Sequence, residues 1–456
     1  MISYNGFGGC TKCLQLGETV LTEKGGHTHI YPFNKQNPTG PARSDESYND
    51  DVNKKYKNNG VLGYCSLSLL EIFHPVSGTC IDYMHTVLEG VVKSLFNKWF
   101  SQENYSKDYS LRKEMVLIDK RLISIRPPKF IPTTPRSIQS WKTWRAHEYL
   151  SFLIYYSIPI FNDIMESDQL EHLIKLVIFM EIILSREIKL EDLDLAQKII
   201  EAFVEDYSKL YTISSMLSGV HELLHLVECT KHFGPLNNIN CFPFEELNRK
   251  VIGTIHGRSL IGEEFIKLFS LMQSQSYTVT SFAKQSKLVN FIKKEMVFKT
   301  SNRKKTNYGK IEIKVLGRKE IIKDSQVLTV IDKTLGIKLE EIETFSKIVI
   351  NDVIFTTGKL ETKNSDSCFR SKEGKIGYIE FFFSINKKFY VAAKQIVPYN
   401  NPYYWNKFPK IRTCTNVCYI SKNIIIEEVQ FINKLALMIV ENNYFVSSFS
   451  ISHLFN

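Results

Sequence analysis

The spacing of apolar residues changes once along this sequence, from a helical pattern to a strand-like one, and this change limits the folds that the chain can adopt. From Asp82 to about Phe298 apolar residues recur at helical spacing, and after about Thr300 they alternate with polar residues in short runs. The first strong pattern predicts an amphipathic helix that opens near Asp82, with Asp82 in its first turn. The apolar face of this helix consists of Ile81, Met84, Leu88, Val91, Val92, Leu95 and Trp99.

Further helices are predicted on both sides of a proline-rich segment. Ser137 can cap a helix that follows it, and later helical patterns cover Leu170–Leu184, Leu190–Tyr211 and Met216–Lys231. Ile125–Pro135 cannot form a regular helix, because proline removes a backbone donor and fixes φ. We expect a linker or an extended surface strap there.

Strands are predicted where apolar and polar residues alternate between clusters of Gly, Asn and Lys, at Lys310–Val315, Ser346–Thr356, Ile376–Phe383, Lys388–Ala393 and Val417–Ile420. We expect a small sheet or barrel, with a boundary near Ser301. The fold class is therefore α/β overall. Residues 1–63 form a Cys-x-x-Cys segment with a mobile loop, 64–283 a mainly helical region, 284–319 a basic linker, and 320–456 a β-rich C-terminal domain.

The composition indicates an ordinary globular protein. The chain has 456 residues, 43% hydrophobic and 23% charged, which is enough for two or three domains. It contains no uncharged apolar run of about 18 residues and no signal-peptide layout, so we expect neither a membrane span nor secretion. Nine cysteines in a chain of this size indicate reduced thiols in the cytosol or nucleus. The formal charge of +10 permits an anionic partner without requiring one.

Two short motifs have the spacing of metal ligands. Tyr4–Cys13 reads YNGFGGCTKC, and the two thiolates of a Cys-x-x-Cys pair can share one zinc ion. His221–His225 reads HELLH, the pattern of zinc peptidases, with two histidines on one helical face. No clear third ligand follows in a helical frame, so we expect no peptidase activity. The alternative is an ordinary helix whose histidine pair is partly solvated.

Several blocks in one order resemble the animal branch of CACTA (En/Spm)-type DNA transposases over roughly the first 270 residues. These blocks are Tyr4–Cys13, Gly60–Gly63, Cys80–His85 (CIDYMH), Pro135–Ser137, Trp144–Glu148, Leu153–Ser157, His225–Glu228 and Cys241–Asn248. The chain therefore resembles a transposase that is truncated at its N-terminus.

The resemblance implies a ribonuclease-H-like catalytic region, incomplete in this chain, with a large helical insertion. Such DDE-type enzymes cut and join DNA through three carboxylates that hold two divalent metals, Mg or Mn. By resemblance Glu245 is the third carboxylate, and Asp82 and His85 also belong to the catalytic region. The family's two aspartates lie upstream of the Cys-x-x-Cys, where this chain has not yet begun, so we expect it to be catalytically incomplete.

The resemblance also pairs Cys10 and Cys13 with Asp82 and His85, as the family's Cys-x-x-Cys and Asp-x-x-His. Because a helical Asp and His at i, i+3 project on one side, Cys10, Cys13, His85 and a fourth ligand could form a structural zinc site. The alternative is that the thiols are free and His85 caps a buried polar pocket.

A basic stretch, Lys284–Lys319, is the strongest electrostatic feature. Its candidates for phosphate contact are Lys293, Lys294, Arg303, Lys304 and Lys305, and Asn302–Lys305 could serve as a nuclear-import signal. A charge run of this kind is also common on a solvated surface.

Two functions stay open at this point. The first is a transposase subunit whose retained parts bind transposon ends. The second is a non-catalytic scaffold that binds DNA or chromatin. Both functions predict DNA as the partner, with specific or nonspecific contacts, and the nucleus as the location. Neither predicts a membrane or a small-molecule substrate, and both leave open whether the chain forms a homo-oligomer.

Overall fold

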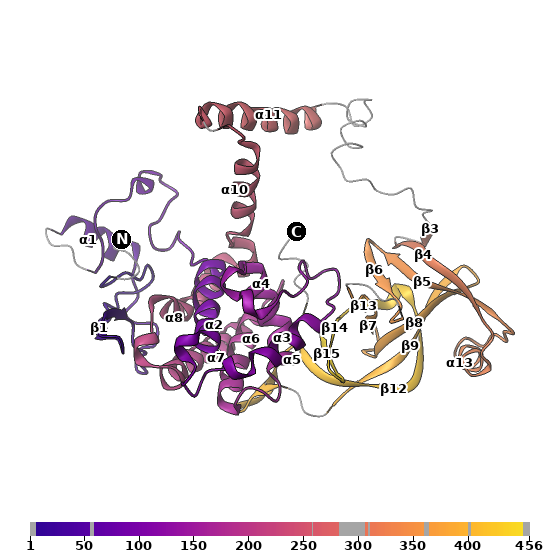
Figure 1. Cartoon of the computed structure of the whole chain (residues 1–456). Helices are drawn as coiled ribbons and strands as arrows, with labels where there is room; N and C mark the ends of the chain where they lie inside the picture. The colour runs from indigo at the N-terminus through magenta and orange to yellow at the C-terminus, as the bar shows by residue number, and fades with distance from the viewer. Residues whose placement is uncertain are drawn as a thin grey trace. The chain divides into compact units, whose positions relative to one another are not determined.

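The computed structural model of this chain describes residues 6–54, 59–257, 259–281, 306–308, 311–359, 364–399 and 403–449. The chain divides into two compact units, Met1–Asn240 with Val315–Asn456, and Cys241–Lys314. The first unit combines helices with a large antiparallel sheet, so the expected α/β class and the β-rich C-terminal region are confirmed (Figure 1). Among the described residues, no helix is both long and apolar enough to cross a membrane.

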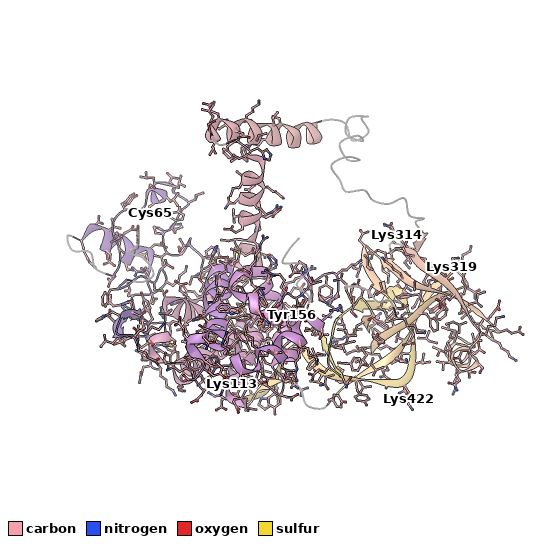
Figure 2. All side chains as sticks on the ribbon, in the orientation of Figure 1. Cys65, Lys113, Tyr156, Lys314, Lys319 and Lys422 are labelled. Atoms are coloured by element: carbon pink, nitrogen blue, oxygen red, sulfur yellow. The ribbon has the colours of Figure 1, made fainter. Side chains whose placement is uncertain are left out.

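The helical part of the first unit packs around aromatic side chains. The Phe96 ring lies with its centroid 4.9 to 6.2 Å from the ring centroids of six neighbours, Trp99, Phe100, Trp141, Trp144, Tyr149 and Phe152. Tyr156, labelled in Figure 2, is buried in the same core. The main helices are α1 (Asp45–Asn53), η2 (Met84–Val92), α2 (Lys93–Phe100), α3 (Met115–Ser124), α4 (Ala146–Ser151), η6 (Phe152–Tyr156), α5 (Ser157–Phe161), α6 (Ser167–Ile183), α7 (Leu190–Leu210), α8 (Ser218–Glu222), η8 (Leu223–His225) and α9 (Leu226–Phe233).

The helix predicted to open near Asp82 is confirmed, although its first half is the wider π-helix η2, which α2 continues. Asp82 caps this helix, because its Oδ2 accepts the backbone N–H of His85 at 3.0 Å. The predicted apolar face is buried, at Ile81, Met84, Leu88, Val91, Val92, Leu95 and Trp99.

The later predictions in this part are also confirmed. The helices expected after residue 165 appear as α6, α7 and the run α8–η8–α9, and Ile125–Pro135 contains no helix. Ser137 caps the short 3-10 helix η5 (Ile138–Thr143), since its hydroxyl accepts the N–H of Gln139 at 3.2 Å. Capping by serine stabilises a first turn whose amides otherwise have no partner.

The strands of the sheet are hydrogen-bonded in the order β14-β15-β12-β9-β8-β5-β4. In addition, β6 pairs with β5, and β7 pairs with both β8 and β13. Its central pairs, β5–β8, β8–β9, β9–β12, β12–β15 and β14–β15, are antiparallel. A separate hairpin, β1 (Glu18–Leu21) with β2 (His27–Ile30), lies in the N-terminal segment. The strands are β4 (Ile311–Ile322), β5 (Ile342–Ile350), β6 (Val353–Thr356), β7 (Cys368–Ser371), β8 (Ile376–Ile385), β9 (Lys388–Pro398), β10 (Tyr404–Trp405), β11 (Phe408–Arg412), β12 (Thr415–Glu428), β13 (Ile432–Lys434), β14 (Ala436–Val440) and β15 (Asn443–Ser447).

One helix, α13 (Ser325–Leu335), packs against this sheet. Asp324 caps its start by accepting the N–H of Gln326 at 2.9 Å, and Gly336 ends it in the left-handed conformation that favours glycine. Its apolar side chains form a core cluster with the sheet, consisting of Leu328, Ile331, Ile342, Phe383 and Ala392.

The proline-rich strap Ile125–Pro135 joins the helical part to the sheet through polar contacts. The carbonyl of Pro127 accepts the N–H of Ser365 at 3.1 Å, and the N–H of Lys129 donates to Asp366 at 2.9 Å. Asp366 is buried and forms an ion pair with the buried Lys434. Breaking one partner of such a pair leaves an uncompensated charge, so this contact fixes where the strap meets the sheet.

The second unit contains α10 (Phe242–Thr254), α11 (Ile261–Ser281) and β3 (Thr306–Tyr308), which pairs antiparallel with the first residues of β4. Pro243 lies in the first turn of α10, where its missing N–H costs no helical hydrogen bond. Both helices expose large apolar side chains, among them Phe244, Ile252 and Ile266.

A buried carboxyl group lies where α6 meets the sheet. Glu181 is 4% exposed, and its two oxygens accept the N–H of Cys414 at 3.1 and 3.0 Å. Burial raises the pKa of Glu181 to about 8. The protonated form is therefore the one that the folded protein favours.

The pH dependence of stability should reveal this group. Because the folded pKa of Glu181 exceeds the unfolded one, its contribution is fully present below about pH 4 and is lost as the pH rises toward 8. We expect the free energy of unfolding in urea to fall by up to about 1.4 kcal/mol per pH unit across this range. Glu181→Gln should flatten the profile, and the exposed Glu187→Gln should not. Identical profiles for the two variants would contradict this account.

Candidate metal centre

Four potential metal ligands converge in the helical part of the first unit. Cys10 and Cys13 come from the N-terminal segment, His221 from α8 and His225 from η8. Their ligand atoms all lie within 4.8 Å of one another, and each of the four residues is at most 3% exposed. The cluster could hold a metal ion such as zinc, which prefers thiolate and imidazole donors.

The spacing of the two imidazoles agrees with tetrahedral coordination. Nε2 of His221 lies 3.3 Å from Nε2 of His225, and two nitrogens bound at the usual Zn–N length of about 2.0–2.1 Å and at the tetrahedral angle would be about 3.3 Å apart. Cys13 Sγ lies 3.2 Å from His221 Nε2, whereas a sulfur and a nitrogen on one zinc ion would be about 3.6 Å apart. The residues present therefore fit a four-coordinate ion after a shift of a few tenths of an ångström at the Cys13 sulfur.

Local structure explains why these side chains face one another. His221 and His225 are four residues apart on one helical run, so they share a face. The Cys-x-x-Cys turn is held by backbone contacts, since Cys13 bridges to Ala42 and the N–H of Lys12 donates to Cys10 Sγ at 3.4 Å. An N–H donor at a sulfur stabilises the thiolate that a metal requires.

The two thiols already differ in acidity. The Cys10 thiol donates a hydrogen bond to Cys13, and this bond lowers the pKa of Cys13. The same bond, together with burial, raises the pKa of Cys10. A metal ion that replaces the shared proton would allow both sulfurs to be thiolates.

Tyr31 and Arg43 contact the cluster residues and hold them in place. The Tyr31 ring stacks on His221 with centroids 4.9 Å apart, and its hydroxyl accepts the N–H of Gly9 and donates to the carbonyl of Gly6, both at 3.0 Å. Arg43, 5% exposed, donates to the Cys13 carbonyl at 3.2 Å. Such outer contacts orient metal ligands and tune their affinity.

Lys12 ties the Cys-x-x-Cys turn to the segment before η2. Its buried ammonium donates to the carbonyls of Val76, at 2.8 Å, and Thr79. A second thiol pair, Cys80 with Cys229, lies beside it, and a hydrogen bond from Cys80 lowers the pKa of Cys229. The turn, the start of η2 and α9 are thus joined by polar contacts.

With four protein ligands the cluster has the composition of a structural site, whereas catalytic zinc keeps a position open for water. Glu222, the glutamate of the HELLH pattern, accepts a hydrogen bond from the Thr86 hydroxyl at 2.9 Å, and burial raises its pKa. The geometry therefore gives no support to peptidase chemistry.

The residues expected from the sequence are only partly brought together. Cys10 and Cys13 belong to the cluster, but His85 does not: its side chain is 53% exposed and its Nδ1 lies 2.7 Å from Asp82 Oδ2. This exposure also overturns the alternative in which His85 caps a buried pocket. The expectation of a partly solvated His221–His225 pair is wrong, since both residues are buried by the N-terminal segment and the helices around them.

The other candidates lie in the second unit or outside the described residues. Glu245 is exposed in the first turn of α10, and within its own unit it joins no group of three metal-binding side chains among the described residues. Lys293, Lys294, Arg303, Lys304 and Lys305 lie outside the described residues.

One available signal was missed in the sequence. A Cys-x-x-Cys followed by a His-x-x-x-His is a typical zinc donor set, but the usual spacer is about 12–15 residues. Here 208 positions separate Cys13 from His221, so the two halves look like unrelated motifs.

Comparisons of the chain with family models, with curated proteins and with solved structures find no match.

Zinc content should depend on the histidine pair. We expect the purified protein to carry one zinc per chain, and His221→Ala or Cys13→Ser to lose it, while His85→Ala keeps it. Because metal binding energy is folding energy, chelation should cost several kcal/mol, or about 10 °C in Tm for a chain of this kind. Elemental analysis and thermal unfolding measure both effects. Equal zinc content in His221→Ala and the wild type would exclude the site.

Tyr31→Phe tests the support of the cluster. The ring that stacks on His221 is retained, but the hydrogen bonds to Gly6 and Gly9 are removed. Zinc affinity, measured by competition with a chelating dye, should fall by about 10- to 100-fold. Tyr378→Phe, which removes a hydroxyl bonded to Gly358 in the sheet, should leave the affinity unchanged.

Proposed function

We propose that this chain is a transposase-derived protein of the CACTA type, which associates with DNA through a helical scaffold stabilised by zinc. One observation carries the proposal: two blocks that resemble this family meet at the metal centre. Cys10 and Cys13 lie in the block Tyr4–Cys13, and His225 opens the block His225–Glu228.

The two blocks are far apart in sequence. The segments Tyr4–Cys13 and His225–Glu228 are separated by more than 200 residues, yet their thiols and imidazole share one buried cluster. This convergence supports the proposal that the blocks belong to one structural unit. Zinc is the ion proposed, because the cluster offers two sulfur and two nitrogen donors.

The finer fold assignment is part of the same proposal. We assign the helices of the first unit to the large insertion of a ribonuclease-H-like region, as the resemblance implies. Within residues 6–240 the described strands form one hairpin, β1 with β2. This arrangement is compatible with an insertion and with an incomplete catalytic region.

Metal-dependent cleavage is not proposed for this chain. Two Mg²⁺ or Mn²⁺ ions need several carboxylate oxygens to hold them. The residues of the second unit do not fit such a pair, because Glu245 is exposed and has Glu246 as its acidic neighbour in α10, and Glu246 pairs with Arg249 at 2.7 Å. The proposed role is therefore that of a DNA-associated scaffold, located in the nucleus.

The experiment is a parallel assay of binding and cleavage. We expect a labelled DNA duplex to bind the purified protein, with an affinity that falls steeply as salt rises. Supercoiled plasmid should remain intact with Mg²⁺ or Mn²⁺. Nicking that is abolished by Glu245→Gln but not by Glu246→Gln would overturn the non-catalytic assignment. Absence of duplex binding at low salt would overturn the proposed function itself.

A further inference from the structure

A short basic hairpin stands apart from the main sheet of the first unit. Strands β10 and β11 pair only with each other, with Tyr404 opposite Arg412 and Trp405 opposite Phe408. The sequence Tyr404–Arg412 reads YWNKFPKIR, with three cations and no acidic residue. Lys407, Lys410 and Arg412 are all exposed.

The hairpin is fixed to the helical part through Trp405. This side chain is 3% exposed, and the ammonium of Lys175 on α6 lies 5.6 Å from its ring centroid. Asn406 bonds Glu171 on α6, and the N–H of Thr413 donates to the carbonyl of Tyr403 at 3.1 Å. The three cations are therefore presented by a rigid element, which reduces the entropy cost of binding a ligand.

The charges of the hairpin are not neutralised locally. Lys407, Lys410 and Arg412 form no ion pair with a residue in the described part of the chain. Glu171, which bonds the hairpin residue Asn406, already pairs with Lys175 at 3.4 Å. Lys407 also lies 5.9 Å from the ring centroids of both Trp405 and Phe408, which holds its ammonium beside the turn.

We propose that the β10–β11 hairpin contacts the phosphate backbone of duplex DNA through Lys407, Lys410 and Arg412. Residues 410 and 412 are two apart on one strand, so their side chains leave the same face of the ribbon, about 7 Å apart. A two-stranded ribbon fits the width of the major groove, and unpaired cations on it gain energy by releasing counterions from the duplex. The inference rests on the proposed association with DNA and names a surface for it.

A duplex is favoured over an anionic membrane by the shape of the element. The charged side chains that the hairpin exposes are all cationic, and its largest apolar group, Trp405, is buried against α6. Membrane-surface elements combine cations with exposed apolar side chains that enter the bilayer, whereas Phe408 and Ile411 of this hairpin are half-buried.

The test compares two triple variants that remove the same charge. The hairpin variant is a full-length chain that combines Lys407→Gln, Lys410→Gln and Arg412→Gln. The control variant combines three substitutions of exposed lysines in the sheet region, Lys333→Gln, Lys338→Gln and Lys387→Gln. Fluorescence anisotropy with a labelled duplex is recorded over a series of salt concentrations. The slope of log K against log salt should fall by about three for the hairpin variant, because each of the three cations neutralises one phosphate in the wild type.

The outcomes separate the two proposals. The hairpin variant should bind at least about tenfold more weakly than the control variant at the same salt, with an unchanged Tm. If the wild type binds duplex and both variants weaken it equally, the hairpin assignment fails and the DNA association stands. If the wild type binds phosphatidylserine vesicles through the hairpin but binds no duplex, both proposals fail.

Discussion

The contact between the Cys13 thiol and the His221 imidazole joins segments that are 208 residues apart, and the packing of the N-terminal segment depends on it. Closing a loop of this length costs little more than closing one half as long, about 0.6 kcal/mol for each doubling. Burying two thiols and two imidazoles side by side is a larger cost, because each loses water and His225 Nδ1 finds no hydrogen-bond partner among the described residues. A shared metal ion would remove this penalty by bonding to all four donors, and would thereby stabilise the segments that carry them.

The contacts around the cluster connect it to neighbouring parts of the N-terminal segment. Tyr31 stacks on His221, Arg43 bonds the Cys13 carbonyl, and Lys12 reaches from the Cys-x-x-Cys turn to Val76 and Thr79. The first two contacts involve a ligand directly, and the third joins the turn between the two cysteines to the segment before η2. The sheet is attached to the helices by different means, through the Asp366–Lys434 ion pair and the buried Glu181. One side of the first unit thus depends on the Cys/His cluster, which could hold a metal ion, and the other on buried carboxyl groups.

Local patterns in the sequence predicted the elements well where one face is buried. The helix from Met84 to Phe100 and the helix α7 follow from apolar spacing, since burial of one stripe sets the period. Strands β14 and β15 were missed, because both are short and largely buried and therefore show no alternation. The Cys-x-x-Cys was identified as a metal ligand, but its histidine partners were not. Partner choice is a tertiary property: His85 and His221 both follow Cys13 in the sequence, and only folding brings one of them to the thiols.

The HELLH segment illustrates how the surroundings of a motif decide its chemistry. Two histidines at i, i+4 can bind zinc in any helix, and a glutamate beside them becomes a base only if a water molecule completes the coordination. Here two sulfurs would take the remaining positions on a bound ion, and Glu222 bonds Thr86 at the start of η2. The same five residues thus join three segments of the chain instead of activating water. The β10–β11 hairpin does not depend on this cluster, because it is held to α6 through the buried Trp405.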